Sequence, residues 1–170
     1  KRVTLDNQDV GCATAPILWG MAGSVGQHAF HQLFYQGTRL TPIDFVVPVG
    51  DANPEQEALV ANALAQGAAL MKGKSLAEAT AQLVAAGKSA AEAERLAPHL
   101  ACPGNQPSTT LLMPRLTPRT LGSLIALYEH KVAVQGCLWG VNSFDQWGVE
   151  HGKQMAREIL PKMLAGTGDF

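Results

Sequence analysis

The residues between Val141 and Lys153 carry side chains that could do chemistry, because an amide and an ammonium group recur there at helical spacing. If a helix begins near Asp145, Gln146 and Lys153 are seven residues apart, which is nearly two turns. Both side chains would then point the same way, about 10 Å apart along the helix axis. Four apolar residues fall on the adjacent stripe: Val149, Ile159, Leu160 and Met163. At the rim of this stripe the two groups could line a pocket; alternatively, Lys153 is a solvated lysine whose stem covers the edge of the core.

A strand, a glycine-containing loop and a helix are expected near the other end of the chain. The apolar run of residues 16–19 predicts a short buried strand. A helix is expected over residues 25–36, with Ser24 as its N-cap, Gln27 completing a capping box and Gly37 as its stop. In a parallel sheet such a loop lies at the carboxyl end of a strand, where ligands bind.

His28 lies in the expected first turn of this helix, beside the loop. The positive end of the helix dipole disfavours the imidazolium form, so a neutral imidazole that exchanges protons is one interpretation. The other is a capping or core histidine. His31 is interpreted as a polar residue of the same helix.

The remaining elements follow from apolar periodicity and capping signals. Two further strands are expected, over residues 43–49 and 108–113. The apolar run of the first of these strands suits a sheet covered on both faces. Five further helices are expected: from Pro54 to about Lys72, from Ser75 to near Gly87, from Ser89 to before Pro98, from Thr117 to Gly136, and from about Asp145 to about Leu164. The charged residues 129–131 lie off the apolar stripe of their helix and are interpreted as a solvated face.

The bulk composition indicates a globular chain and gives no sign of a nucleic-acid, membrane or metal partner. The chain has 170 residues, 46% of them hydrophobic and 16% charged, and a net charge of −1, which argues against nucleic-acid binding through a basic field. It has no apolar run of eighteen residues that would span a membrane. The three cysteines and five histidines follow no metal-ligand spacing, so no metal is expected. Strands alternate with helices, which predicts an α/β fold with a mainly parallel sheet.

Several motifs resemble the glucose-6-phosphate isomerase family, and the likeness covers essentially the whole chain. The family pattern Phe-Asp-Gln-x-Gly-Val-Glu-x-x-Lys occurs at residues 144–153. Residues 23–33 are similar to its Gly-Thr-Asn-Gly-Gln-His-Ala/Ser-Phe-Tyr-Gln-Leu motif, although Met21, Ala22 and Val25 replace commoner family residues in this loop. Residues 104–108 and 116–131 also follow the family, with Gln106 in place of an Arg.

The resemblance implies a reversible isomerisation of glucose 6-phosphate and fructose 6-phosphate through a cis-enediol, without cofactor or metal. It assigns His28 and Lys153 to opening of the sugar ring and Gln146 to substrate binding. It implies a three-layer sugar-isomerase (SIS-type) fold. Residues 1–170 would be the later half of the C-terminal sugar-isomerase domain and the start of the C-terminal helical region.

The family's base, a Glu in a Met-Glu-Ser-Asn-Gly-Lys motif, would fall before Lys1, which matches the final Lys of that motif. The isolated chain is therefore expected to be an inactive fragment. The resemblance also implies a cytoplasmic homodimer with shared active sites, in which His28 acts beside Lys153 of the other subunit.

Other functions remain open at this point. The chain could be a non-catalytic sugar-phosphate-binding SIS module, although such a module has no need of a ring-opening pair. It could be purely structural, or a metal-dependent isomerase. If the chain alone were active, Glu129 or Glu150 would be the base to test.

Overall fold

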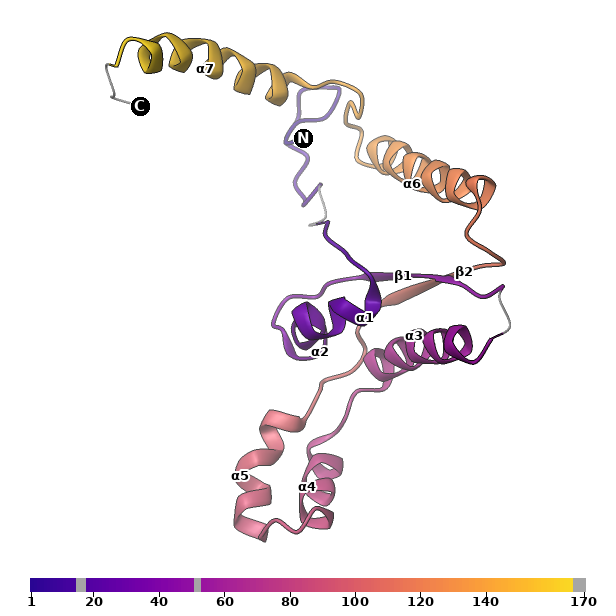
Figure 1. The fold of residues 1–170 in the computed structure, drawn as a ribbon. Helices are drawn as coiled ribbons and strands as arrows, with labels where there is room; N and C mark the ends of the chain where they lie inside the picture. Colours follow the sequence, from indigo (N-terminus) through magenta and orange to yellow (C-terminus); the bar gives the residue numbers. More distant parts are fainter. Residues whose placement is uncertain (15–17, 51–52, 167–170) are drawn as a thin grey trace. The chain divides into compact units, whose positions relative to one another are not determined.

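The computed structural model describes residues 1–14, 18–50 and 53–166. The chain divides into two compact units. Residues 1–17 and 124–170 form one of them, called here the terminal unit, and residues 18–123 form the central unit. Figure 1 labels the helices and strands, which are described below unit by unit.

A parallel pair of strands lies in the central unit. Strand β1 (Ile43–Pro48) pairs with β2 (Ser108–Met113) in a register that runs from Ile43 opposite Ser108 to Pro48 opposite Met113. This confirms the predicted α/β fold with a parallel sheet and the two strands expected here. The strand expected at residues 16–19 is not tested in full, because residues 16 and 17 lie outside the described ranges. Its described half, Leu18 and Trp19, has no strand structure.

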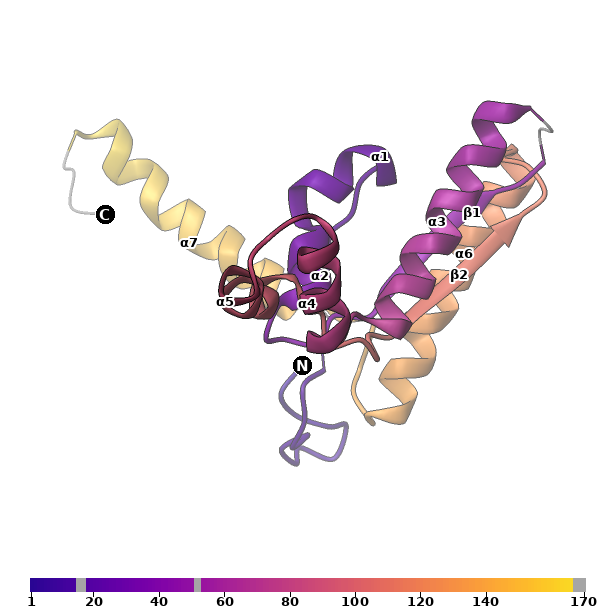
Figure 2. The same ribbon diagram turned by 90° about the horizontal axis from the view of Figure 1, so that it is seen from below.

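Helix α3 (Pro54–Lys72) lies along the two strands (Figures 1 and 2). Asn53 caps it as predicted, because its side-chain oxygen accepts a hydrogen bond from the backbone N–H of Gln56 at 2.9 Å. Gly73 ends it with a φ of +68°, a left-handed conformation that glycine adopts without strain.

One face of the strand pair packs against α3. A Cβ added to Gly67 of α3 would lie 3.9 Å from Cε2 of Phe45, and Val47, two residues further along the same face, is buried. On the other face, Val46 is exposed. The expected burial of both faces is therefore not seen within the described residues.

Helices α4 (Leu76–Ala85) and α5 (Ala90–Leu100) form a hairpin at the lower end of Figure 1. Their shared core contains the following residues: Ala79, Leu83, Ala93, Leu96, Ala97 and Leu100. The small alanines allow close approach of the two helices. The prediction that α5 ends before Pro98 is wrong. The helix continues to Leu100, where the side-chain N–H of Gln36 donates to the backbone oxygens of His99 and Ala101 at 3.0 and 2.7 Å.

The helix that carries His28 is continuous but irregular. It consists of α1 (Gly23–Gly26), a π-helical segment (Gln27–His31) and α2 (Gln32–Gln36). The predicted capping box of Ser24 and Gln27 does not form, because the helix begins at Gly23 and Ala22 is its N-cap. Ser24 lies inside the first turn, too late in the chain to act as N-cap.

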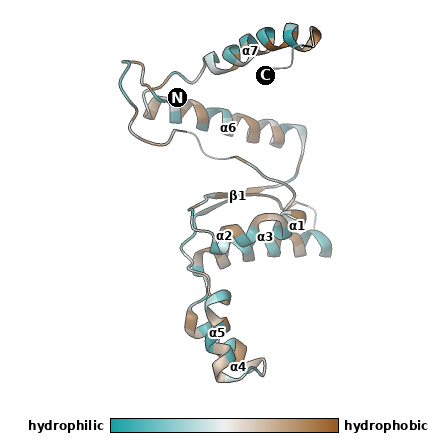
Figure 3. Ribbon diagram, turned by 90° about the vertical axis from the view of Figure 1, so that its left-hand side faces the viewer, coloured by the Kyte–Doolittle hydropathy of each residue, from teal (hydrophilic) through white to brown (hydrophobic). Residues whose placement is uncertain are grey.

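In the terminal unit, α6 (Pro118–Leu138) continues from the central unit and is followed by α7 (Trp147–Leu164). The predicted stop at Gly136 is wrong. A Cβ at Gly136 would collide with the side chain of Ser143, so this glycine permits close approach of the returning chain. The turn comes at Gly140, where φ is +61°. Figure 3 shows hydrophobic and hydrophilic residues mixed along α7.

Candidate functional site

His28 is exposed and forms no hydrogen bond or ion pair within the part of the chain that the structure describes. It lies in the π-helical segment, two residues deeper in the helix than predicted, because the helix begins at Gly23. Both ring nitrogens of His28 are therefore available to a substrate as hydrogen-bond donor or acceptor.

An aromatic cluster packs the His28 helix against the segment that precedes it. Phe34 is buried, and its ring lies 5.2 Å from that of Phe30 and 5.8 Å from that of Trp19, measured between centroids. Gly26 is buried beside Phe30, where a Cβ would be 3.0 Å from Cζ. His28 is therefore a free side chain on a packed backbone.

Gln146 is the N-cap residue of α7. A helix beginning near Asp145, as predicted, would have made it the second helical residue. Its backbone is non-helical (φ −133°, ψ 35°), and its carbonyl oxygen accepts from the N–H groups of Val149 and Glu150 at 2.9 and 3.2 Å. Its side chain makes no capping bond. The predicted alignment of Gln146 and Lys153 over two full helical turns does not hold, because the helix begins at Trp147.

Lys153 donates to Glu150 Oε1 at 2.7 Å, and both side chains are more than half exposed. The apolar stripe next to it is not a buried face in this chain, since Val149, Leu160 and Met163 are all exposed. The structure thus brings Gln146 and Lys153 together on one segment of the terminal unit. His28 lies on the central unit.

An ion pair that the sequence analysis missed holds the chain just before α7. The Lys1 ammonium contacts Asp145 Oδ1, and the backbone N–H of Leu5 donates to the Gly140 oxygen at 2.7 Å. The two charged residues are 144 positions apart. No local pattern signals such a pair.

The charged residues 129–131 of α6 are exposed, in agreement with their interpretation as a solvated face. His130 Nδ1 lies 2.6 Å from the Ala126 oxygen of its own helix, and the Lys131 ammonium lies 5.4 Å from the centroid of the Tyr128 ring. His130 and Lys131 therefore have their partners within α6 itself.

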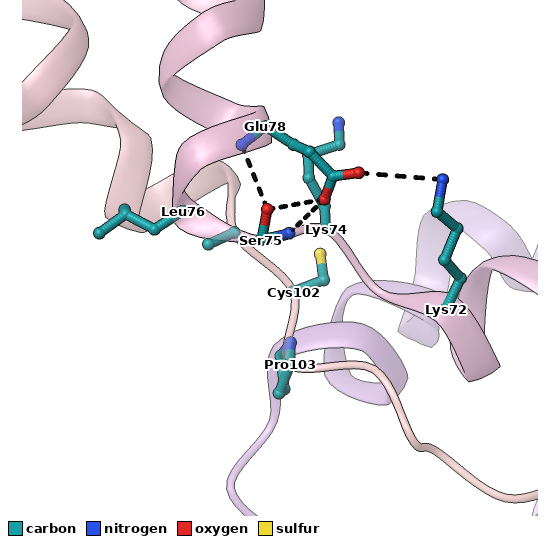
Figure 4. Close-up of a pocket in the computed structure, with 8 residues that line it drawn as sticks. Lys72, Lys74, Ser75, Leu76, Glu78, Cys102 and Pro103 are labelled. Carbon is teal, nitrogen blue, oxygen red and sulfur yellow. Dashed lines mark hydrogen bonds and ion pairs between the residues drawn. The ribbon is translucent and has the colours of Figure 1, made fainter.

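A cavity of about 450 Å³ opens in the central unit beside the start of α4 (Figure 4). Its lining consists of Lys72, Lys74, Ser75, Leu76, Glu78, Ala101, Cys102 and Pro103. The residues predicted to do chemistry are not among these. The backbone and side-chain hydrogen bonds from Ser75 hold the pKa of Glu78 below its usual value, helped by the charges of Lys72 and Lys74.

Among the described residues, no group of three or more His, Cys, Asp or Glu side chains could hold a metal ion. The three cysteines are free thiols. None of the described helices combines the length and apolarity needed to cross a membrane.

Comparison with known proteins places these residues in a family. The phosphoglucose isomerase family profile matches residues 1–169. The glucose-6-phosphate isomerase of Aromatoleum aromaticum is 58% identical over 170 residues, which cover 99% of this chain and 30% of the relative. That of Stutzerimonas stutzeri is 55% identical over 166 residues and likewise covers 30% of the relative. The crystal structure of a glucose-6-phosphate isomerase from Chlamydia trachomatis superposes with a TM-score of 0.78 at 34% identity, over 96% of this chain and 30% of that one. The chain thus spans about 30% of the length of these relatives, and it belongs to the phosphoglucose isomerase family.

Proposed function

We propose that this chain is part of an enzyme that interconverts glucose 6-phosphate and fructose 6-phosphate. The observation that carries the proposal is the family match over residues 1–169, supported by relatives named for this activity at more than half identical positions. The exposed and uncommitted imidazole of His28, on a firmly packed helix, suits a group that must reach a substrate.

In the proposed mechanism, His28 and Lys153 open the sugar ring. A proton leaves the C1 hydroxyl as another reaches the ring oxygen, and the bond between C1 and that oxygen breaks. Gln146 donates and accepts hydrogen bonds beside the substrate. The Lys153 ammonium also stabilises the negative charge of the enediolate that forms next.

A carboxylate must then carry a proton between C2 and C1, and we assign this step to a glutamate outside these 170 residues. This assignment follows the family resemblance, in which the base precedes the position of Lys1. It agrees with the length of the relatives, of which the chain covers 30%. No step in this scheme needs a metal or an organic cofactor.

The same proposal includes a cytoplasmic homodimer whose two active sites each combine residues of both subunits. His28 would meet Lys153 of the partner.

The test is a chimeric enzyme in which this chain replaces the matching segment of the Aromatoleum aromaticum relative. Fructose 6-phosphate conversion is measured in a coupled assay for the chimera and for the 170-residue chain alone. We expect activity in the chimera and none in the chain. Dialysis of the chimera against a chelator should leave the rate unchanged.

Other outcomes would point to other functions. An inactive, folded chimera that still binds sugar phosphate would favour a binding module. Activity lost to the chelator and restored by a divalent cation would favour a metal isomerase. Activity of the short chain would mean that the base lies within it, and Glu129 or Glu150 would be replaced next.

A further inference from the structure

The His28 helix is joined to α3 by a set of side-chain hydrogen bonds that the proposed mechanism does not use. Gln27 Nε2 donates to Asn62 Oδ1 at 2.7 Å, and the Tyr35 hydroxyl donates to Gln66 Oε1 at 2.7 Å. His31 Nδ1 lies 3.3 Å from the same Gln66 oxygen. Every partner belongs to the central unit.

Each hydrogen bond of this network joins a donor to an acceptor. Gln66 Oε1 can only accept, so the proton of the His31 ring lies on Nδ1 and Tyr35 donates its hydroxyl proton. Gln66 Nε2 donates in turn to Asn62 Oδ1 at 3.3 Å. Gln66 is thus the centre of the network, with both ends of its amide used.

His31 is the most strongly committed member, because only 8% of its surface is exposed. A buried polar ring that loses its partner destabilises the fold, so the bond to Gln66 favours one orientation of the helix. Burial also raises the pKa of Tyr35, with a smaller effect from nearby Cys102, so this hydroxyl stays protonated and able to donate.

The spacing of these residues fixes the rotation of the helix about its axis. Gln27, His31 and Tyr35 recur every four residues and face Asn62 and Gln66, which are also four apart. Four residues make close to one turn in both α- and π-helical geometry. A slip of one residue would turn every side chain by about 100°.

His28 follows Gln27 directly but lies outside the network, exposed. The direction of its ring therefore depends on the rotation that the network sets. The contacts of Trp19 with Phe30 and Phe34 join the helix to the segment before it without this directional restraint, because apolar contacts tolerate rotation.

We propose that Gln66 is a positioning residue that acts with His31 and Tyr35 to aim the His28 imidazole at the sugar ring. This inference rests on the proposed isomerase function. Misplacing a reacting group by about 1 Å can cost roughly a hundredfold in rate, so a side chain remote from the substrate can matter this much.

The test is a double-mutant cycle in the chimeric enzyme. Gln66→Met keeps the length of the side chain and removes its hydrogen bonds. It should lower kcat by about tenfold to a hundredfold, with little change in KM. In the His28→Asn background the same substitution should change kcat by less than about twofold, because the group that it positions is gone. Gln66→Glu keeps the acceptor oxygens and should restore most of the rate.

Two further variants control for damage to the fold. Gln82→Met removes the 2.7 Å bond that Lys74 Nζ donates to Gln82 Oε1, elsewhere in the central unit, and should leave kcat unchanged. Tyr35→Phe is a milder change, which removes the hydroxyl contacts with Gln66 but keeps the bond between Gln66 and His31, and it should lower kcat by less than Gln66→Met does. Equal losses from Gln66→Met with and without His28 would overturn the inference, and so would no loss at all.

A second readout separates this inference from the proposed function. The His28 ring resonance of histidine-labelled chimera, assigned by its absence in His28→Asn, should shift or broaden in Gln66→Met and not in Gln82→Met. If the unmodified chimera has no isomerase activity, the proposed function fails, and this resonance still decides whether Gln66 positions His28. An unchanged resonance in Gln66→Met would then refute the positioning role.

Discussion

At the scale of single residues, two histidines three positions apart have opposite environments. His31 is buried and bonded to Gln66, whereas His28 is exposed and uncommitted. A structural histidine is expected to be satisfied and buried, while a proton-transfer group must remain available to substrate. The contrast therefore favours His28 as the reactive member of the pair.

Replacement of His28 by Asn in the chimera should lower kcat for fructose 6-phosphate by about 10²–10⁴-fold, the usual contribution of a general acid or base. The fold should be unaffected, because His28 makes no bond within the described residues. Steady-state kinetics and circular dichroism measure the two effects. His99→Asn, at an exposed histidine of α5, serves as the matched control and should keep the full rate.

Lys153 offers a second test, because it forms an exposed ion pair with Glu150 and a lysine outside the site forms a similar pair with another glutamate. Lys88 and Glu92 form an exposed pair at 3.7 Å, and Lys153 and Glu150 form one at 2.7 Å. Exposed pairs contribute about 0–1 kcal/mol, so neither lysine should matter much for stability. We expect Lys153→Met to lower kcat at least about tenfold and Lys88→Met to leave it unchanged. Equal rates for the two variants would show that Lys153 is an ordinary surface lysine.

At the scale of elements, the start of α4 should depend on pH. Ser75 and Glu78 form the predicted capping box, in which the Ser75 backbone N–H donates to Glu78 Oε2 at 2.8 Å. A carboxyl whose pKa is lower in the folded state stabilises the fold above its unfolded pKa and ceases to do so as pH falls through the folded value. Here that window begins near the reference value of 4.5 and extends below it.

We therefore expect Glu78→Gln to lower the melting temperature of the chain at about pH 7, and the difference from wild type to shrink at about pH 3. Thermal unfolding followed by circular dichroism at both values measures this. In the Ser75→Ala background, where the bonds from the serine hydroxyl are absent, the effect should be smaller. A difference that stays the same at both pH values would contradict the assignment.

Two glycines in the connections around α4 form a second test at this scale. Gly73 and Gly87 both have positive φ, at +68° and +83°. A Cβ at Gly73 would lie 2.5 Å from the backbone oxygen of Cys102, whereas nothing lies within 4 Å of one at Gly87. Gly87→Ala should cost about 1 kcal/mol, from backbone strain alone. Gly73→Ala should cost more than about 2 kcal/mol, because the strand-like contact with Cys102 must also shift. Chemical denaturation of the two variants measures the difference.

The sequence predicted these elements well wherever the determining contacts are local. The caps at Asn53 and Ser75 are correct because each side chain bonds to a backbone group three residues away. The cap at Ser24 is wrong, and Gln27 bonds instead to Asn62, 35 residues further along the chain. Sequence periodicity holds no information about such a partner.

The same division applies to the candidate site. The motif around residues 144–153 predicts Gln146 and Lys153 as site residues. The position of Gln146 relative to the helix depends on the first residue of α7, which is Trp147, two residues after the predicted start near Asp145. The ion pair of Lys1 with Asp145 and the network around Gln66 join distant segments. Both required the folded structure.

At the scale of the whole molecule, the chain has many apolar side chains without cover. Ile125 and Val132 of α6 and Leu160 of α7 are more than half exposed. The chain also spans only 30% of its relatives' length. Exposed apolar surface of this kind is typical of a face that meets another part of a protein or another subunit. Kinetic measurements can directly test one such contact, the proposed homodimer with shared active sites.

Subunit mixing provides this test. Chimeras carrying His28→Asn or Lys153→Met should each be nearly inactive alone. If each site takes His28 from one subunit and Lys153 from the other, a mixed dimer has one site with both substitutions and one with neither. After joint unfolding and refolding of equal amounts, about a quarter of the wild-type activity should return, since half of the dimers are mixed and each has one intact site. If both residues of a site came from the same subunit, every site would keep one defect and no activity would return. Mixing His28→Asn with Gln82→Met controls for the refolding step and should recover about half of the activity under either arrangement.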